Sequence, residues 1–364
     1  MTVKGAAPIR SVAPATAEEV SALLREGGPV LLRGGGTQDG MGGPLRTAPI
    51  LCATTALRMT PIAHEPEDLT VTVPAGLRWA ELQGQLGRHG QWVPCDPPAP
   101  ETATVGGVVA GNAFGPWRQS QGSMRDLLIG LQAVAGTATA FRAGARVAKS
   151  VAGFDLCKLL VGSAGTLAVL TECSFKVRPL PAARRTFMTH GTALAALDLP
   201  VPPAALAAWP DGRLLIAYEG SAKAVDAGGA GLREMYAEVE EAPASAWDEV
   251  RGHMHQGPLV VRASVPAGEV AALALAMDRL GYACVACPGF GMVWGRHQEP
   301  TDAVWRQAAA LARAAGGRAL CAVAPEGIAD PWDANPALLP LYRALKERFD
   351  PAGVFAPGRF VGGI

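Results

Sequence analysis

One stretch decides how this chain folds: Arg33-Gly34-Gly35-Gly36-Thr37-Gln38-Asp39-Gly40-Met41-Gly42-Gly43. It follows the apolar run Pro29-Val30-Leu31-Leu32, which predicts a short strand that ends in a glycine-rich loop. Six glycines within ten positions let the backbone reach positive φ and approach a ligand closely, because no Cβ stands in the way. Successive N–H groups of such a loop can form a concavity that binds anions.

Two familiar phosphate loops do not fit this stretch. A Walker loop ends in Gly-Lys-Ser/Thr, whereas Gly43 is followed by Pro44 and Leu45. The dinucleotide fingerprint needs a third glycine where Asp39 stands and then a helix, which the glycine-rich continuation disfavours. Two interpretations stay open: a phosphate-binding loop between two strands, or a plain glycine-rich connection.

Length and composition predict a globular protein of two domains. The chain has 364 residues, of which 49% are hydrophobic and 18% charged, so it can bury a sizeable core. Its 32 lysines and arginines balance 32 aspartates and glutamates, so nucleic-acid binding is not expected. No apolar run approaches the roughly 20 residues that cross a bilayer, and residues 1–14 lack the hydrophobic region of a signal peptide. We therefore expect a cytoplasmic protein, at most peripheral to a membrane.

The seven cysteines are expected to be buried, reduced thiols, because most of them lie in apolar segments. Cys284 and Cys287 form the one Cys-x-x-Cys pair of the sequence. A structural zinc site or an iron–sulfur cluster needs about four ligands, so no metal site is expected.

The first part of the chain predicts a β-rich lobe with small helices. Residues 15–27 are typical of a helix with Thr16 as its N-cap. Strands are expected at 29–32, 50–54 and 69–73, and a short helix carries the apolar stripe of Trp79, Leu82 and Leu86.

Two further glycine-rich segments follow. Residues 97–115 read PPAPETATVGGVVAGNAFG. They begin with rigid prolines and continue with a diglycine and with small residues at positions where a helix normally has large side chains. Such a surface suits close contact with a large planar ligand, and the alternative is a buried glycine-rich turn. Residues 125–131 predict a turn into a strand. In residues 153–172 an amphipathic turn leads into Gly162-Ser163-Ala164-Gly165-Thr166, and a strand through Phe175 follows.

In order and spacing, residues 33–43, 104–115, 124–131 and 161–172 resemble the FAD-binding domain of the vanillyl-alcohol oxidase / p-cresol methylhydroxylase flavoproteins. The closing sequence ERFDPAGVFAPGRF is similar to that family's ending, with Ala356 in place of the usual Asn. The resemblance covers about residues 1–180 and 337–364. It implies an α+β fold with three parts: a two-lobed FAD-binding domain at 1–180, a smaller α+β cap domain at 181–336, and a C-terminal segment, 337–364, that returns to the first domain.

The resemblance also implies which residues hold FAD. Gly34, Gly35, Gly36 and Thr37 are expected at its pyrophosphate. The other residues expected to contact the cofactor are Arg33, Gln38, Thr104, Gly106, Gly107, Asn112, Gly115, Asp126, Gly162, Ser163, Gly165, Thr166, Leu167 and Arg359. Members of the family that attach FAD covalently often carry His where Thr37 stands. A threonine does not form that bond, so noncovalent FAD is expected.

The middle of the chain predicts an α+β cap built on one sheet. Strands are expected at 213–218, 259–265, 282–287 and 320–323, and helices at 222–239, 267–280 and 302–315. The linker is expected at Pro179-Leu180-Pro181.

No catalytic residue is assigned from the sequence. A flavin that oxidises a 2-hydroxy acid needs Arg or Lys for the carboxylate and a base, commonly His, near the hydroxyl. Many related 2-hydroxy-acid dehydrogenases carry a His-rich metal motif in the cap, which this sequence lacks. His253 and His255 would point to one side on a strand, and are otherwise exposed loop residues before the strand at 259. Trp294, Arg296 and His297 either face the flavin or form an ordinary strand end.

With its compact middle, the chain is most similar within that family to the FAD-binding subunits of bacterial glycolate oxidase. This resemblance implies an FAD-dependent oxidoreductase that oxidises glycolate, with D-lactate as a second candidate, to the 2-oxo acid. The implied partners are a larger FAD-containing subunit and an iron–sulfur subunit, which would bring the chain to the inner membrane. The alternative is a self-sufficient FAD-dependent 2-hydroxy-acid or alcohol oxidoreductase. A structural subunit with a vacant flavin site is disfavoured, since nothing else in a folded loop requires so many glycines.

Overall fold

The computed structural model describes residues 5–145, 155–328 and 330–364. The chain divides into two compact units. The first comprises Met1–Phe114, Ser123–Pro179 and Glu326–Ile364, and the second comprises Gly115–Gly122 and Leu180–Pro325. Each unit combines helices with mainly antiparallel sheet, so the fold is α+β, as predicted.

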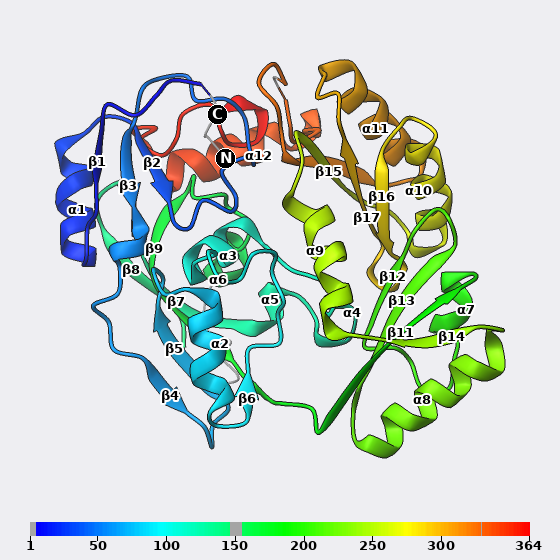
Figure 1. Cartoon of the computed structure of the whole chain (residues 1–364). Coiled ribbons are helices and arrows are strands. Elements are labelled where there is room, and N and C mark those ends of the chain that lie inside the picture. Colours follow the sequence, from blue (N-terminus) through cyan, green and yellow to red (C-terminus); the bar gives the residue numbers. More distant parts are fainter. Residues whose placement is uncertain (1–4, 146–154, 329) are drawn as a thin grey trace. The chain divides into compact units, whose positions relative to one another are not determined.

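The described part of the first unit contains three sheets (Figure 1). A parallel sheet has the order β1 (Arg10–Val12), β3 (Ile50–Ala53), β2 (Val30–Arg33). An antiparallel sheet has the order β4 (Ala63–Glu65), β5 (Thr70–Pro74), β9 (Ala168–Lys176), β7 (Leu128–Ala135), β8 (Ala140–Gly144). The third sheet pairs β6 (Gln91–Trp92) with β10 (Arg178–Pro179).

The helices of the first unit are short, apart from α1 and α12. They are α1 (Ala17–Glu26), α2 (Trp79–Gly87), α3 (Val105–Gly111), α5 (Met124–Leu127), α6 (Leu156–Leu160) and α12 (Leu339–Phe349). The N-cap predicted at Thr16 is confirmed, because its side chain accepts a hydrogen bond from the Glu19 N–H at 3.2 Å. Helix α1 buries Val20, Leu23 and Leu24 in a core shared with β2, β3 and the C-terminal Phe355.

The C-terminal segment lies beside β2, the strand that leads into the glycine loop. The Val30 N–H donates to the Val354 carbonyl at 2.7 Å, and the Ala356 N–H donates to the Val30 carbonyl at 2.9 Å. Strand β2 therefore has a backbone partner on each side, β3 and residues 354–356, although the last of these lies more than 300 positions further along the chain.

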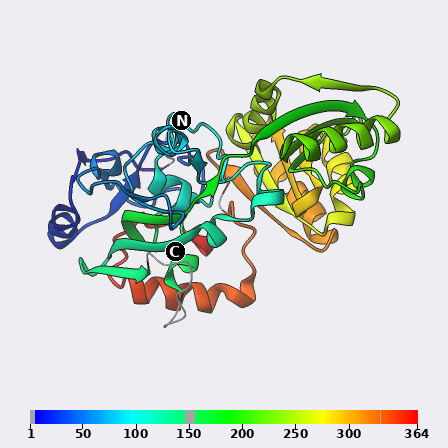
Figure 2. The same ribbon diagram turned by 90° about the horizontal axis from the view of Figure 1, so that it is seen from below.

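The second unit is built on one eight-stranded antiparallel sheet (Figures 1 and 2). Its order is β14 (Val239–Ala242), β11 (Ala183–His190), β13 (Arg213–Gly220), β12 (Ala205–Ala208), β16 (Ala283–Cys287), β17 (Met292–His297), β15 (Leu259–Ser264), β18 (Arg318–Val323). The helices packed on it are α4 (Arg118–Gln121), α7 (Ala193–Leu197), α8 (Ala222–Met235), α9 (Trp247–His255), α10 (Val270–Asp278) and α11 (Asp302–Ala314).

Helices α9 and α10 cover opposite faces of this sheet at β17. A Cβ on Gly295 would lie 2.6 Å from Met277 Cε of α10, whereas the next residue, Arg296, contacts His253 of α9. Adjacent residues of a strand point to opposite faces, so these two contacts place the two helices. The four strands and three helices expected in the middle of the chain are present. Strands β11, β12, β14 and β17 and helices α7 and α9 were not among those expected.

The compact units differ from the expected domain boundaries in two places. Residues 115–122 were placed in the first domain, but they belong to the second unit. There the Trp117 Nε1 donates to Glu219 Oε2 at 2.8 Å and its ring packs edge-on against Trp247 at 5.0 Å. Residues 326–336 were placed in the cap, but they belong to the first unit, where the Trp332 Nε1 donates to the Arg359 carbonyl at 2.9 Å.

Candidate functional site

The three glycine-rich segments meet around one cavity of the first unit. Its walls come from the end of β2, the glycine loop, helix α3, the turn before β9 and the start of β9 itself. The lining residues are Leu31, Leu32, Arg33, Gly34, Gly35, Gly36, Thr37, Gln38, Asp39, Met41, Thr54, Gly106, Gly107, Ala110, Gly111, Ala164, Gly165, Ala168, Val169, Leu170 and Arg359.

The glycine loop packs against the second segment too closely for side chains. A Cβ on Gly35 would lie 1.7 Å from the Thr102 carbonyl oxygen, and one on Gly34 would lie 2.2 Å from Thr104 Oγ1. Gly36 is the member of this trio with positive φ, at +78°. Glycine is therefore required at positions 34 and 35 because the backbone lies close to the second segment, and at position 36 because φ is positive.

Helix α3 turns its small residues toward the cavity. It begins at Thr104, whose Oγ1 accepts a hydrogen bond from the Gly107 N–H at 3.2 Å. Its three valines are buried in the unit, while Gly106, Gly107, Ala110 and Gly111 line the cavity. The second segment is thus a helix with a flat face, which fits close ligand contact and differs from the alternative of a buried turn.

The third segment closes the C-terminal end of α3. The Gly162 N–H donates to the Val109 carbonyl at 3.1 Å, and the Ala164 N–H donates to the Ala110 carbonyl at 2.8 Å. The Val109 carbonyl also accepts from the Asn112 N–H at the C-cap of α3, so the third segment adds to the capping of this helix end. Gly165, with φ of +68°, then turns the chain into β9 along the cavity wall. Gly153 and Phe154, at the start of this segment, lie outside the described residues.

Among the described residues, three charged side chains line the cavity: Arg33, Asp39 and Arg359. Arg33 forms an ion pair with Asp39 at 2.7 Å and is 40% exposed. Arg359 is buried and donates to the carbonyl oxygens of Asp39, at 3.3 Å, and Met41. Burial lowers the pKa of Arg359 to about 10, so the side chain stays charged at neutral pH. Arg359 thus holds the glycine loop in place through its backbone.

The cavity includes ten of the residues expected to contact the cofactor: Arg33, Gly34, Gly35, Gly36, Thr37, Gln38, Gly106, Gly107, Gly165 and Arg359. The others do not line it: Thr104, Asn112, Gly115, Asp126, Gly162, Ser163, Thr166 and Leu167. Several of these serve local structure instead. Thr104 and Asp126 cap helices α3 and α5, and the Thr166 hydroxyl donates to the Ser163 carbonyl at 2.7 Å. Gly115 belongs to the second unit.

Sequence analysis missed several lining residues. Asp39, Ala110 and Ala164 lie inside the glycine-rich segments and could have been included on that ground. Residues 168–170 also lie inside the third segment, as the first residues of β9, whereas Thr54, in the turn that follows β3, lies outside all three segments.

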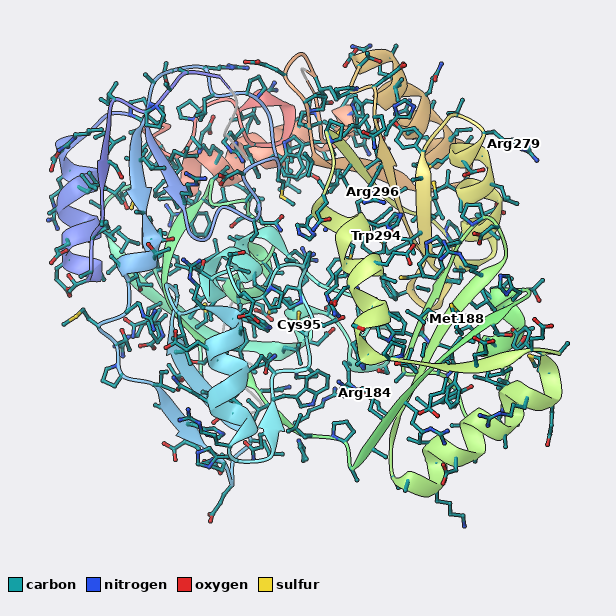
Figure 3. The ribbon with its side chains drawn as sticks, in the orientation of Figure 1. Cys95, Arg184, Met188, Arg279, Trp294 and Arg296 are labelled. Carbon is teal, nitrogen blue, oxygen red and sulfur yellow. The ribbon has the colours of Figure 1, made fainter. Side chains whose placement is uncertain are left out.

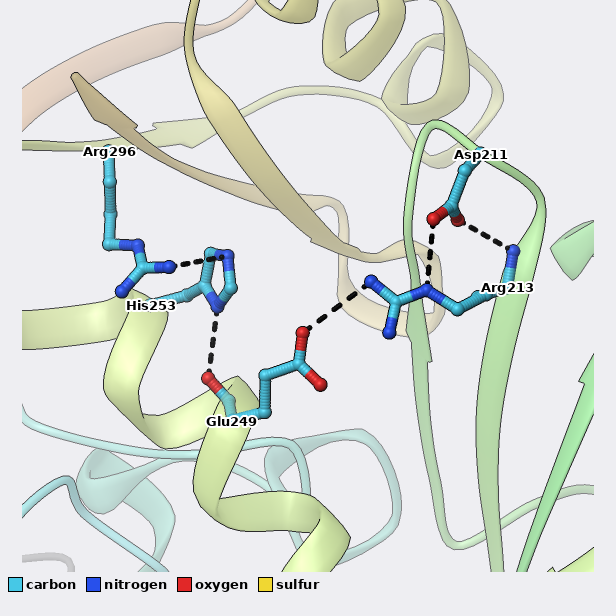
Figure 4. A network of polar contacts seen from close by, with 5 residues as sticks. All are labelled: Asp211, Arg213, Glu249, His253 and Arg296. Atoms are coloured by element: carbon cyan, nitrogen blue, oxygen red, sulfur yellow. Dashed lines mark hydrogen bonds and ion pairs between the residues drawn. The ribbon is translucent and has the colours of Figure 1, made fainter. Parts of the chain in front are cut away.

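His253 and His255 lie neither on a strand nor in an exposed loop, the two positions predicted for them, and Figure 4 shows the surroundings of His253. His253 and His255 lie on helix α9, and their Nδ1 atoms bond to the carbonyls of Glu249 and Arg251 one turn earlier. His253 is buried, and its Nε2 lies 3.2 Å from an Arg296 nitrogen. An arginine only donates, so Nε2 is the acceptor and Nδ1 carries the proton. Burial, then the charge of Arg296, lowers the pKa of His253.

Trp294, Arg296 and His297 do not share one face of the sheet. Trp294 and Arg296, both marked in Figure 3, are two positions apart on β17 and therefore lie on the same face. His297 lies on the opposite face, packed edge-on against Tyr282 at 4.8 Å and bonded to the Leu280 carbonyl at 3.1 Å. His297 is thus a structural residue of the core, and the interpretation of all three as facing one ligand is wrong.

The cysteine prediction is confirmed, since all seven are buried thiols that form no disulfide. No group of histidine, cysteine or carboxylate residues suited to a metal ion occurs in the described ranges. Among those same residues, no helix has both the length and the apolar character needed to cross a bilayer.

Comparison with known proteins bears on this cavity directly. The FAD binding domain family matches residues 8–144. Over 358 residues the chain is 32% identical to glycolate oxidase subunit GlcE of Escherichia coli (strain K12), covering 94% of this chain and 95% of that protein. It is 37% identical to D-lactate dehydrogenase of Archaeoglobus fulgidus and 32% identical to glycolate oxidase subunit GlcD of Bacillus subtilis (strain 168). These two matches cover 46% and 50% of this chain, but only 38% and 39% of the relatives.

Among solved structures, alkyldihydroxyacetonephosphate synthase has a TM-score of 0.68 at 17% identity. The match covers 94% of this chain and 75% of that one, and at this identity it shows a shared fold.

Proposed function

This chain belongs to the family of FAD-dependent oxidoreductases that includes glycolate oxidase subunit GlcE, and on this premise we propose that it is the FAD-binding subunit of a multi-subunit glycolate oxidase. The observation that carries the proposal is the similarity to GlcE, which spans nearly the whole of both chains. The complex would oxidise glycolate, with D-lactate as a second candidate substrate, to the 2-oxo acid.

The cavity of the first unit suits FAD in the chemistry of its walls. Its backbone at Gly34–Gly36 carries no side chain that would keep a diphosphate from the N–H groups, and Arg33 brings a positive charge. The face of α3 carries only hydrogen atoms and methyl groups toward the cavity, which suits a flat ring system. We assign the diphosphate to Gly34–Thr37 and the flat face of α3 to the rest of the cofactor.

Bound FAD would supply the capacity to accept a hydride from a 2-hydroxy acid. Among the described residues, the cavity wall offers neither histidine nor lysine as a base for the substrate hydroxyl, and its one carboxylate, Asp39, is ion-paired with Arg33. General base catalysis is worth roughly 10²- to 10⁴-fold in rate. This lack supports a subunit that depends on partners over a self-sufficient enzyme.

The partners we propose are a larger FAD-containing dehydrogenase subunit and an iron–sulfur subunit. The described part of this chain offers no cluster of metal ligands, and an iron–sulfur centre on another chain could accept the electrons that leave its FAD. Any contact with the inner membrane would be peripheral and would run through those partners.

The test is an assay of the purified, FAD-loaded chain with an artificial dye, first alone and then with the partner subunits. We expect little turnover of glycolate or D-lactate by the lone chain and a large gain on adding the partners. Turnover by the lone chain at rates typical of enzymes, on the order of 10 per second, would instead support the alternative of a self-sufficient oxidoreductase. That alternative is favoured by the D-lactate dehydrogenase of Archaeoglobus fulgidus, which shares 37% identity with half of this chain.

A further inference from the structure

Asp39 places a carboxylate inside the anion-binding loop. Only 7% of the residue is exposed, and it lines the same cavity as Gly34, Gly35 and Gly36. Within the described residues, its ion-pair partner is Arg33, whose guanidinium nitrogen lies 2.7 Å from Oδ2. A buried carboxylate is normally surrounded by several donors, so one ion pair satisfies this group only in part.

The position of Asp39 is costly in a site for a diphosphate. Arg33 and Arg359 give the cavity wall two positive charges, and an ionised Asp39 cancels one of them. Arg359 is buried and donates to two loop carbonyls, whereas the Arg33 side chain is 40% exposed. Asp39 and an incoming diphosphate would therefore compete for the guanidinium group of Arg33.

Burial raises the pKa of Asp39, although Arg33 and Arg359 oppose the shift. A diphosphate in the cavity would oppose ionisation further, since like charges disfavour each other. The ionised carboxylate and the bound diphosphate would therefore repel each other, and both would use Arg33 as their counterion.

We propose that Asp39 competes with the FAD diphosphate for Arg33, and so sets how weakly the loop holds the cofactor. The proposal rests on the assignment of FAD to this cavity and adds a residue that controls its affinity. Replacing the carboxylate by an amide of the same shape then frees Arg33 for the diphosphate. FAD binding becomes tighter in this variant, which is the opposite of what a residue that helps to bind the cofactor would give.

The experiment measures the dissociation constants of FAD and of riboflavin for the full-length apoprotein by flavin fluorescence. Asp39→Asn is expected to bind FAD about tenfold more tightly or better, as removal of one charge near a dianion predicts. Riboflavin has no phosphate, so its affinity should be the same in both proteins. Glu26→Gln removes an equal charge from the exposed end of α1, outside the cavity, and should change neither constant.

Each other result is informative. If FAD binds the original chain but binds Asp39→Asn equally or more weakly, the proposal is wrong and the cofactor assignment stands. An equal gain for riboflavin would also overturn it, because the effect would not lie at the diphosphate. If the folded chain binds no FAD at all, the proposed function itself fails.

A second measurement covers the case in which Asp39→Asn does not fold. The FAD affinity of the unaltered chain should rise as pH falls from 8 to about 4, because burial raises the pKa of Asp39 above its ordinary value of 3.8 and protonation removes the competing charge. Arg33 and Arg359 are the other charged groups of the cavity wall and do not titrate in this range, and no histidine lines it. An affinity that stays constant over this range would contradict the proposal.

Discussion

Lys346 Nζ lies 2.7 Å from Asp350 Oδ2, one helical turn apart, with 4% and 1% of the two residues exposed. The same ammonium donates to the carbonyls of Thr166 at 2.8 Å and Phe355 at 2.9 Å. The carboxylate accepts from the N–H groups of Val354 and Phe355, each at 2.8 Å. The pair therefore joins α12 and the C-terminal segment to the turn that leads into β9.

Breaking this buried pair should destabilise the first unit strongly. Lys346→Met leaves a buried carboxylate without its cation, which typically costs about 3–5 kcal/mol of unfolding free energy. Urea unfolding would measure it. The matched control, Glu26→Gln, breaks the exposed pair of Arg10 and Glu26 and should cost less than about 1 kcal/mol. Equal losses of unfolding free energy in the two variants would show that the buried Lys346–Asp350 pair stabilises the first unit no more than an exposed pair does.

Gly35→Val should abolish FAD binding and leave the rest of the unit folded. The reason is space, because Gly35 does not have positive φ and its Cβ would overlap the Thr102 carbonyl. Flavin content and thermal unfolding of the purified variant measure the two effects separately. Gly84→Ala is the control, since Gly84 lies within α2 with no atom near its would-be Cβ. It should keep its flavin and gain up to about 1 kcal/mol in stability. A Gly35→Val protein with normal flavin would mean that the loop is only a connection.

Noncovalent attachment is the third prediction. Thr37 lines the cavity where covalent members of the family often carry His, and the cavity wall includes no histidine. Acid precipitation of the purified protein should leave the yellow chromophore in the supernatant. Flavin that stays in the pellet after washing would contradict this expectation.

Acid should destabilise the second unit through His253. Burial and the charge of Arg296 lower its pKa in the folded state, so the unfolded chain binds more protons just below the ordinary value of 6.5. Stability therefore falls as pH drops through 6.5 toward the folded-state pKa, with a slope of at most about 1.4 kcal/mol per pH unit for one proton. The charged groups near the ring are Arg296, Arg213 and Glu249 (Figure 4).

The measurement for His253 is urea unfolding between pH 7.5 and pH 5. His253→Gln should lose part of the pH dependence of the original chain, whereas the control His190→Gln, at an exposed position, should keep it. If the His253→Gln curve runs parallel to that of the original chain, the ring titrates alike in the folded and unfolded states.

Much of the site could be predicted from sequence because its signals are local. Each of these signals involves residues only a few positions apart. They are a glycine that follows a strand, a threonine that caps the N–H three residues later, and small residues along one face of a helix. Thr16 and Thr104 cap the helices that follow them, and three separated glycine segments line one cavity.

The predictions that failed concern elements whose type is decided by packing rather than by a local sequence signal. Helix α9 was missed because its stability comes from Trp247, Val250 and Met254 packing into the core, while its exposed face has only ordinary polar residues. The single face expected for Trp294 and His297 failed on the strand's period of two, which the sequence carries but which matters only once β17 is known to be a strand.

By itself, the sequence determined the glycine-rich loop, the flat helix and the family to which they belong. Only the tertiary structure decided what surrounds them: Arg359 bonded to the loop carbonyls some 320 positions away, and Asp39 buried against Arg33. Backbone conformation follows from neighbouring residues, through steric limits and hydrogen bonds within one turn. Burial, and with it the charge state and partners of each polar group, depends on which distant segments close over that turn.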